Sequence, residues 1–364
     1  MRTKILYVAS TESHLCRFHI PYIEALRKQY EVKTMATGKQ IDFPVLFDKH
    51  FFSVANLKSI RTIRGILKRE RFDAVLIHTT LAAFLVRAAM LGWGRKRRPY
   101  VLNVVHGYLF SGKLGGMRDR VLYLCERLMR GKTDDIAVMN QEDMAFAKAH
   151  RLCRGQVYFI NGMGVNLPKT FPPFDAALRA KYAAEGEFLC TFVGELSGRK
   201  NQRFLVDAIK RLRDEGMPIR LLLLGEGSER ENLEAQINKC GLVDAVTLTG
   251  NVEPVLPYLA VSDLYVSASI SEGLPFNVME AMAAGLPIVA SDTKGQNDLL
   301  AGADNCLYPL GDADAFCNAV QRVYASRRFG AGSRVYPSLE KYRLNEVFEE
   351  NMKLLKMGLD RKER

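Results

Sequence analysis

Short apolar segments alternate along the chain with longer segments in which apolar residues recur at helical spacing. In the first half, the segments predicted to be strands are Ile5–Ala9, Ala74–Ile77, Tyr100–Val105 and Ile136–Met139. In the second half they are Phe188–Val193, Arg220–Leu224, Val246–Leu248, Leu264–Ser267 and Pro287–Ala290. Strands that alternate with helices build parallel sheets with crossover helices. The pattern therefore predicts an α/β protein with two such sheets.

A segment dense in glycine and proline, residues 162–173, separates the two series of strands and is the expected linker. We predict an N-terminal domain over residues 1–165, a C-terminal domain over 175–335, and a final segment, 336–364, that packs back on the first domain. Residues 312–325 and 338–357 are expected to be helices, and Ser338 could cap the second. Two doubly wound domains would place the carboxyl ends of their strands, where such sheets bind ligands, on either side of one cleft.

The chain has 364 residues, of which 48% are hydrophobic, and this suits two globular domains. Its longest notable apolar stretch, Leu81–Trp93, is too short to span a membrane and is interrupted by Arg87. The apolar run near the N-terminus is too short for a secretory signal, so we expect a cytoplasmic protein. The 7 cysteines are odd in number and form no C-x-x-C pair, which argues against a disulfide framework and a cysteine-based zinc site.

Charge is distributed unevenly: residues 1–170 carry a net +16, whereas residues 171–364 carry −4. The basic stretches are residues 58–71, 95–98 and 113–132, and the last of these carries Leu114, Met117, Val121, Leu124 and Leu128 at helical spacing. Anionic lipid, nucleic acid and phosphorylated substrates are the candidate partners of such a surface. The alternatives are solvated faces of ordinary helices and, for 113–132, the inward face of a core helix.

The most informative segment runs from Ser267 to Pro287. A strand ends near Ser267, a polar loop follows, and a helix begins near Pro275 and ends before Gly285. The loop thus delivers backbone amides at a helix N-terminus, which favours phosphate. Glu272 in the loop and Glu280 in the helix can face one ligand, the first near its reacting end and the second at paired hydroxyls. Taken alone, glutamates at this spacing are more often solvated surface charges.

A second strand-to-helix loop follows Val193 and contains Arg199 and Lys200. Arginine could bind a diphosphate through a bidentate fork and lysine as a point charge, although isolated cations of this kind are usually surface residues. A third tight corner, Gly225–Gly227, is a weak phosphate-loop signal by itself. The full glycine fingerprint of a dinucleotide-binding loop is missing, which argues against a nicotinamide-dependent dehydrogenase.

These segments, in their order and spacing, resemble the retaining glycosyltransferases of family 4, which have the two-domain GT-B fold. The matching segments are 194–201, 224–227, 248–250, 262–265, 272–275 and 280–289. Segments 18–22, 106–110 and 161–166 are similar, more loosely, to bacterial capsule and exopolysaccharide members. The resemblance implies a nucleotide-sugar donor, expected to be UDP-linked, and a polyprenyl-diphosphate-linked sugar as acceptor.

The resemblance also implies roles for single residues. Glu272 would contact the donor sugar's hydroxyls, Glu280 the ribose hydroxyls, and Arg199 and Lys200 the diphosphate. The backbone groups expected to hold sugar and phosphate belong to Gly194, Gly273, Leu274, Pro275, Phe276 and Asn277. Asn251 and Val252 would border the base, His106 would lie by the donor sugar, and His14, like His19, could touch the acceptor or cap the helix near Pro21. The chain departs from the family at Glu195, where many members have arginine.

The implied chemistry is attack on the same face of the sugar, with the leaving phosphate helping to remove the acceptor proton. We expect no cofactor and no catalytic metal, because the Asp312-Ala-Asp314 string opens a helix and is better explained by capping. The expected location is the inner face of the plasma membrane, bound peripherally and without nucleic acid. The alternatives are a non-catalytic glycosyltransferase-like subunit that binds a membrane or partner enzyme, a nucleotide-sugar epimerase, and a nucleic-acid binder.

Overall fold

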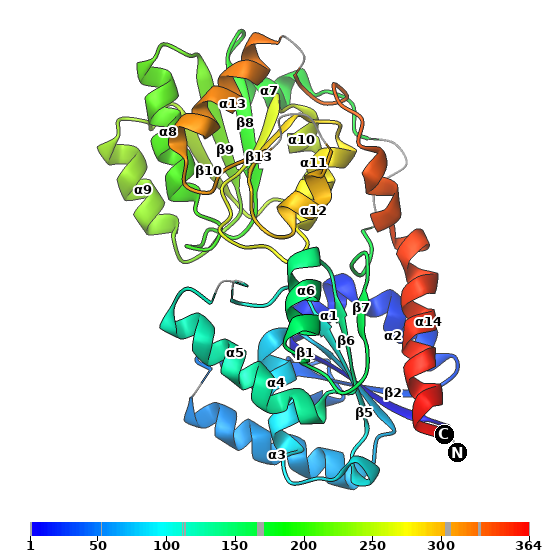
Figure 1. The fold of residues 1–364 in the computed structure, drawn as a ribbon. Helices are drawn as coiled ribbons and strands as arrows, with labels where there is room; N and C mark the ends of the chain where they lie inside the picture. Colours follow the sequence, from blue (N-terminus) through cyan, green and yellow to red (C-terminus); the bar gives the residue numbers. More distant parts are fainter. Residues whose placement is uncertain are drawn as a thin grey trace. The chain divides into compact units, whose positions relative to one another are not determined.

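A computed structural model describes residues 2–51, 53–110, 112, 114–165, 171–302, 307–326 and 329–363, with residues 17, 359 and 361–363 described by their backbone alone. The chain forms two compact units. Unit 1 comprises residues 1–164 together with 341–364, and unit 2 comprises residues 165–340. Each unit is built around one parallel β-sheet (Figure 1). The predicted linker falls where the first unit passes into the second, and its residues 166–170 lie outside the described residues.

The sheet of unit 1 has the order β3-β2-β1-β4-β5-β6-β7, and its strands pair in parallel. The strands are β1 (Lys4–Thr11), β2 (Glu31–Thr37), β3 (Phe43–Pro44), β4 (Ala74–His78), β5 (Tyr100–Val105), β6 (Asp135–Val138) and β7 (Val157–Phe159). The strand order reverses between β1 and β4. Doubly wound sheets bind ligands at the carboxyl ends of the strands at such a reversal.

Helices cover both faces of this sheet (Figure 1). One face carries α3 (Val54–Glu70), α4 (Thr80–Ala89) and α5 (Met117–Met129), and the other carries α2 (Ile20–Arg27) and α14 (Leu344–Glu363). The remaining helical segments are α1 (Glu12–Phe18), α6 (Gln141–Ala149), η1 (Arg95–Arg97) and η2 (Arg130–Lys132). Ile63, Leu85 and Val86 of α3 and α4 pack on alternate residues of the strands, such as Val75 and Ile77. The alternation follows from the period of two along a strand.

Arg87, which interrupts the apolar stretch of α4, is fully buried and binds Glu126 of α5 through two hydrogen bonds of 2.7 and 2.9 Å. This ion pair turns Glu126 inward and fixes which face of α5 is covered. Met117, Leu124 and Leu128 are left exposed, at 75%, 52% and 63%. The alternative that these three positions form the inward face of a core helix is therefore wrong.

The sheet of unit 2 has the order β10-β9-β8-β11-β12-β13, also with parallel pairing. Its strands are β8 (Phe188–Val193), β9 (Ile219–Leu224), β10 (Val246–Gly250), β11 (Leu264–Ser267), β12 (Ile288–Ser291) and β13 (Leu307–Tyr308). The order reverses between β8 and β11. Both sheets are therefore of the doubly wound type, as the sequence predicted.

One face of this second sheet carries α8 (Gln202–Asp214), α9 (Arg230–Lys239) and α13 (Ala313–Ala325) (Figure 1). The other elements of unit 2 are α7 (Ala176–Tyr182), α10 (Leu256–Ala260), α11 (Phe276–Ala283), α12 (Gln296–Leu300) and η3 (Pro337–Tyr342). Asp312 caps α13, because its side chain accepts a hydrogen bond of 2.8 Å from the amide of Ala315. The capping role predicted for the Asp312-Ala-Asp314 string is thus confirmed.

The last helix, α14, belongs to unit 1. The Asn351 side chain donates to Tyr22 Oη (3.0 Å) and to the carbonyl oxygen of Gly162 (2.8 Å). The prediction that Ser338 caps this helix is wrong, since the residues up to Tyr342 form η3 and α14 begins at Leu344. None of the helices in the described part of the chain combines the length and the apolar character needed to cross a membrane.

Candidate functional site

The predicted donor-site residues of unit 2 lie in the loops that follow β8 and β11, the two strands at which the sheet order reverses. Arg199 and Lys200 precede α8, and Glu272 lies between β11 and α11. Because the two strands are neighbours, their carboxyl ends bring the two loops together. The amide of Ile270 donates to the Arg199 carbonyl oxygen (2.9 Å), and the Arg199 guanidinium donates to the Ser271 carbonyl oxygen (3.0 Å).

Glu272 binds both cations. Its carboxylate accepts a hydrogen bond of 2.7 Å from Lys200 Nζ and one of 2.9 Å from the Arg199 guanidinium. The side chains of Glu272 and Lys200 are only 7% and 9% exposed, whereas that of Arg199 is 45% exposed. The cluster therefore consists of one buried ion pair with a second, accessible cation on its open side.

The charges in this cluster control its protonation. Burial alone would raise the pKa of Glu272, but Lys200 and Arg199 outweigh burial and hold it below its ordinary value. Burial and the nearby Arg199 lower the pKa of Lys200, while Glu272 opposes that shift. The Glu272 carboxylate is therefore ionised at neutral pH. The two cations give the cluster a net positive charge.

Residues at the end of β12 and directly after it hold the loop that carries Glu272 through hydrogen bonds. Ser291 and Thr293 donate to the Ser269 carbonyl oxygen, and Gln296 donates to Ser267 Oγ (2.9 Å). A Cβ atom at Gly295, whose φ is +80°, would lie 2.6 Å from a carbonyl oxygen of the same loop. The loop after β12 thus packs directly against the backbone beside Glu272, and only glycine fits at this position.

The loops after β8 and β9 are bonded to each other in the same way. Gly194 N donates to the Leu224 carbonyl oxygen (2.8 Å), and Leu196 N donates to that of Glu226 (2.9 Å). A Cβ atom at Gly225, with φ +144°, would lie 2.0 Å from the Gly194 carbonyl oxygen. The corner that sequence reasoning took as a weak phosphate loop is thus a close backbone contact that positions the loop of Lys200.

Helix α11 carries the second predicted glutamate and, at its N-terminus, the amides that were predicted to bind an anion. Pro275 is the N-cap residue, and no side chain in the described part of the chain caps this end. Glu280 is half-buried. Burial raises the pKa of Tyr265 well above its ordinary value, and Glu280 and Glu272 both raise it further. Both carboxylates therefore act on the Tyr265 hydroxyl through their charge.

The other predicted residues of unit 2 lie around this cluster. Asn277 Nδ2 donates to the Val193 carbonyl oxygen and ties α11 to the end of β8. Asn251 and Val252 follow β10, at the same edge of the sheet but two strands away from β8. Glu195 is exposed and acts on Lys200 through its charge, so it adds no cation to the cluster.

In unit 1, the predicted histidines lie at the carboxyl ends of the central strands. His14 is in α1, directly after β1, and His106 follows β5. His19 lies at the start of α2 but makes no capping hydrogen bond, so the capping role considered for it is wrong. His78, the last residue of β4, joins them, with its Nδ1 3.3 Å from His106 Nε2. Sequence reasoning missed His78, although a polar residue that ends a buried strand is the signal that had singled out His106.

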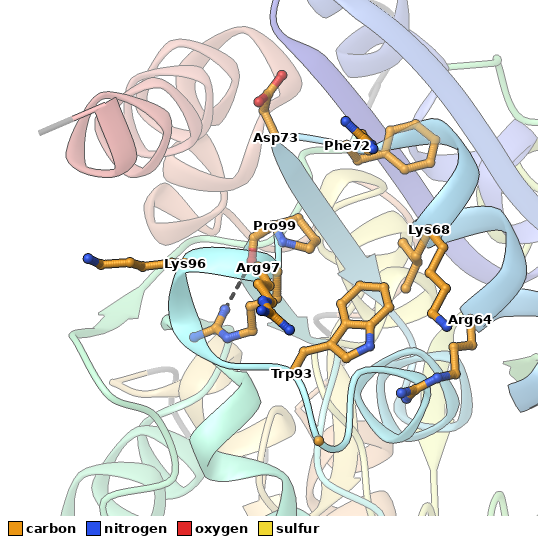
Figure 2. A pocket seen from close by; sticks show the side chains of 12 residues that line it. Arg64, Lys68, Phe72, Asp73, Trp93, Lys96, Arg97 and Pro99 are labelled. Carbon is orange, nitrogen blue, oxygen red and sulfur yellow. Dashed lines mark hydrogen bonds between the residues drawn. The ribbon is translucent and has the colours of Figure 1, made fainter.

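A basic cavity of about 670 Å³ lies at the opposite edge of the same sheet, before the starts of β4 and β5. The cations that line it are Arg64, Lys68, Arg71, Lys96, Arg97 and Arg98. Figure 2 shows the Trp93 ring between the side chains of α3 and those of the loop before β5. Arg98 is tied to Asp134, and Lys132, beyond the end of α5, donates to the Trp93 carbonyl oxygen (2.8 Å). The cavity is thus joined to the end of α5.

Two protein-family models match the chain. Residues 187–326 match the family described as glycosyl transferases group 1, and residues 41–160 match the glycosyl transferase 4-like domain. The two matches fall in unit 2 and unit 1 respectively.

Named relatives extend the likeness over most of the chain. "Putative glycosyltransferase EpsD" of Bacillus subtilis (strain 168) is 30% identical over 338 residues, which cover 89% of this chain and 88% of the relative. The UDP-Gal:alpha-D-GlcNAc-diphosphoundecaprenol alpha-1,3-galactosyltransferase of Escherichia coli is 26% identical over 74% of this chain and 71% of that protein. Among solved structures, HepE of Anabaena in complex with UDP and glucose superposes with a TM-score of 0.71, at 17% identity, over 98% of this chain and 100% of HepE.

Proposed function

The chain belongs to the group 1 glycosyltransferases and has their GT-B fold, and from this premise we propose that it is a retaining enzyme that transfers a sugar from a UDP-linked donor to a lipid-linked sugar. The E. coli relative takes its sugar from UDP-Gal and acts on a diphosphoundecaprenol-linked acceptor, as its name states. We also propose a place in the synthesis of a surface polysaccharide, such as exopolysaccharide or capsule, and the lipid-linked acceptor of the E. coli relative supports this place.

The observation that carries this proposal is the cluster of Glu272, Lys200 and Arg199 beside the start of α11. A leaving diphosphate needs positive charge held in place before the reaction, and the two cations and the helix N-terminus supply it. In the proposed site, Arg199 and Lys200 bind the diphosphate, while Glu272 contacts the sugar hydroxyls and holds both cations. Glu280 binds the ribose. The remaining surface of the donor site is lined by Gly194, residues 273–277, Asn251 and Val252.

The proposed reaction takes place on one face of the sugar. The bond from the anomeric carbon to the diphosphate oxygen breaks, and the bond to the acceptor oxygen forms. The acceptor's proton passes to the leaving phosphate, so no separate protein base is required. Each well-placed donor to the leaving group contributes about 3 kcal/mol. Because the protein itself supplies the groups that stabilise the leaving diphosphate, we propose that the reaction needs no metal and the enzyme no cofactor. The roles of His106 at the sugar and of His14 at the acceptor stay predictions.

Calorimetry and hydrolysis assays with a panel of nucleotide sugars test the donor proposal. We expect one UDP-sugar to bind and to be hydrolysed slowly in the absence of acceptor. Anomeric configuration of the product, measured by NMR, tests retention. Binding of UDP without any turnover, with or without lipid acceptor, would instead favour the non-catalytic subunit, which uses the same fold to bind a partner.

Replacement of Glu280 by alanine should weaken UDP binding by about 1.5 to 3 kcal/mol, because hydrogen bonds from the ribose hydroxyls to a carboxylate are lost. The measurement is UDP affinity by calorimetry on folded protein. Glu231→Ala is the matched control, since Glu231 is an exposed glutamate in the first turn of another helix, α9. An unchanged UDP affinity in Glu280→Ala would remove this residue from the proposed site.

We also propose that unit 1 docks on an anionic membrane. Helix α5 exposes Met117, Leu124 and Leu128 together with Arg127, and Arg130 of η2 follows directly after its end. Exposed apolar and basic side chains on one helix are typical of segments that lie in a lipid interface. The basic cavity at the end of α5 adds further cations (Figure 2). Lys113, the predicted start of this surface, lies outside the described residues.

Sedimentation with liposomes tests the docking. Binding should rise with anionic lipid content and fall with salt, because each lysine or arginine near such a surface contributes about 1 kcal/mol. Arg127→Ala/Arg130→Ala should lose about 2 kcal/mol, and Leu124→Ser/Leu128→Ser should also weaken binding. Val243→Ser is the control, since Val243 is equally exposed, at 67%, but belongs to unit 2. Binding that ignored lipid charge and salt would contradict the electrostatic mechanism.

A further inference from the structure

The basic cavity of unit 1 is lined by residues of α3, of the turn after it and of the segment between α4 and β5 (Figure 2). It lies at the amino ends of β4 and β5, whereas His14 and His106 lie at the carboxyl ends of the central strands. Its volume of about 670 Å³ falls within the range of small-molecule sites, which is about 300 to 1,000 Å³. The cavity is therefore separate from these histidines and large enough for a ligand of its own.

Two of the cations that line the cavity hold its walls in place. Arg98 is buried, and its guanidinium forms hydrogen bonds of 2.5 and 2.7 Å with the Asp134 carboxylate. Arg64 donates to two carbonyl oxygens at the end of α4, at 2.8 and 2.9 Å. Its guanidinium carbon also lies 5.4 Å from the centre of the Trp93 ring. The charge of Arg98 is thus neutralised, and Arg64 fixes the segment that carries Trp93.

The remaining cations of the lining are exposed, and they are Lys68, Arg71, Lys96 and Arg97. None of them forms an ion pair with a carboxylate in the described part of the chain. Among the described residues that line the cavity, Asp73 alone is acidic, and it accepts a hydrogen bond of 2.8 Å from the Lys4 amide. Figure 2 shows the Asp73 side chain directed away from Arg97. The cavity therefore carries positive charge that the protein itself does not neutralise.

The C-terminal end of α3 explains only part of this charge. Cations are favoured near a helix C-terminus, and Lys68 lies in the last turn of α3 while Arg71 is its C-cap. Arg97 and Lys96 belong to a different segment, η1. Figure 2 shows Arg97 and Lys68 on opposite sides of the Trp93 ring, whereas Lys96 points outward. Two segments thus bring like charges to one cavity, which is unfavourable unless they share an anion.

We propose that this cavity is a binding site for a phosphate-bearing anion, which Lys68, Arg71 and Arg97 hold. Arginine binds phosphate oxygens through its planar fork, and lysine binds them as a point charge. Buried Phe72 and half-buried Trp93 supply an apolar surface for the group that carries the phosphate. The site uses no residue of the donor site in unit 2, so it does not depend on the proposed transfer.

The fluorescence of Trp93 tests this site directly, because Trp93 is the one tryptophan of the chain. Titration of the full chain with inorganic pyrophosphate, in EDTA and at constant ionic strength, should change this fluorescence until the site is saturated. Lys68→Ala/Arg97→Ala should weaken binding by about 100-fold or more, since each hydrogen bond to a charged group contributes about tenfold or more. Lys58→Ala/Arg61→Ala is the matched control and should bind as the wild type does. Both residues are exposed on α3 and lie outside the lining.

Vesicles show whether the phosphate belongs to a lipid headgroup or to a soluble compound. If it belongs to a lipid, phosphatidylcholine vesicles that contain phosphatidylglycerol should change the Trp93 fluorescence, and pyrophosphate should compete with them. If it belongs to a soluble compound, the same vesicles should leave the fluorescence unchanged, and pyrophosphate should bind equally well in their presence. Pure phosphatidylcholine vesicles are the control, because they carry no net charge. Either result supports the site and assigns its ligand.

Two results would overturn the proposal. In the first, neither fluorescence nor calorimetry distinguishes Lys68→Ala/Arg97→Ala from its control in pyrophosphate binding. Calorimetry carries the test if the ring of Trp93 does not respond, because the cavity variant should then bind one pyrophosphate fewer. In the second, Arg199→Ala abolishes the response of Trp93, which would place the pyrophosphate at the donor site. We expect Arg199→Ala to lose transfer and keep this response, so failure of the cavity site and failure of the donor site give different results.

Discussion

Glu272→Gln should lower glycosyl transfer by about 100-fold or more while the protein stays folded and still binds UDP. The glutamine keeps the shape of the side chain but removes the charge that holds Lys200 and Arg199 at 2.7 and 2.9 Å. Misplaced donors to a leaving anion cost about 100- to 1,000-fold in rate. Transfer rate and UDP affinity, measured on the same preparation, separate this effect from a loss of nucleotide binding.

Glu231→Gln is the matched control, because Glu231 is exposed on α9 and should leave transfer unchanged. Stability gives a second readout. The pKa of Glu272 lies below its ordinary value in the folded protein, so the ion cluster stabilises the fold above the ordinary carboxyl pKa and loses that effect as pH falls through the folded value. The difference in unfolding free energy between wild type and Glu272→Gln should shrink below about pH 4. Wild-type transfer rates in Glu272→Gln would contradict its role.

Lys200→Ala should destabilise the protein by about 3 to 5 kcal/mol as well as abolish most transfer. Lys200 is the buried partner of Glu272, and its removal leaves a carboxylate that is 7% exposed beside one half-exposed arginine. A position in a loop would by itself lead us to expect a nearly unchanged melting temperature. Burial of this ion pair reverses that expectation for Lys200 but not for Arg199.

Thermal and urea unfolding of Lys200→Ala, Arg199→Ala and Lys210→Ala measure the contrast. Lys210 forms an exposed ion pair with Asp214, so its loss should cost at most about 0.5 kcal/mol. Adding Glu272→Gln to Lys200→Ala should recover part of the lost stability, because the unpaired charge disappears. A Lys200→Ala variant as stable as Lys210→Ala would show that the buried ion pair does not hold this loop.

Much of the fold was readable from the sequence because buried parallel strands are continuous apolar runs. The ranges predicted for β5, β8 and β11 coincide with those of the structure. The sequence gives weaker signals for β2, in which charged and apolar residues mix, and for β13, which has only two residues. These two strands are defined by their pairing with neighbouring strands. Such pairing depends on the tertiary structure and not on the local sequence.

The sequence predicted which residues belong to the candidate site, but it did not predict the ion pairs that these residues form with one another. Motifs singled out Arg199, Lys200 and Glu272, yet the resemblance assigned the carboxylate to the sugar alone. Their mutual ion pairs depend on the loops of β8 and β11 meeting, which no local pattern encodes. His78 lies one residue beyond the predicted strand Ala74–Ile77 and was not singled out, and the basic cavity combines α3 with a distant loop.

Transfer of radiolabelled sugar from UDP-sugars to undecaprenyl-diphosphate-linked GlcNAc, followed by organic extraction, measures the proposed reaction itself. The acceptor is the one named for the E. coli relative. We predict that label enters the lipid phase from one UDP-sugar, only when acceptor is present, and that Glu272→Gln reduces this signal by about 100-fold or more while Glu231→Gln does not. If the wild-type protein transferred label to the lipid phase from none of the UDP-sugars, the proposed activity would be contradicted. If Glu272→Gln transferred sugar as fast as the wild type, the proposed site would be contradicted.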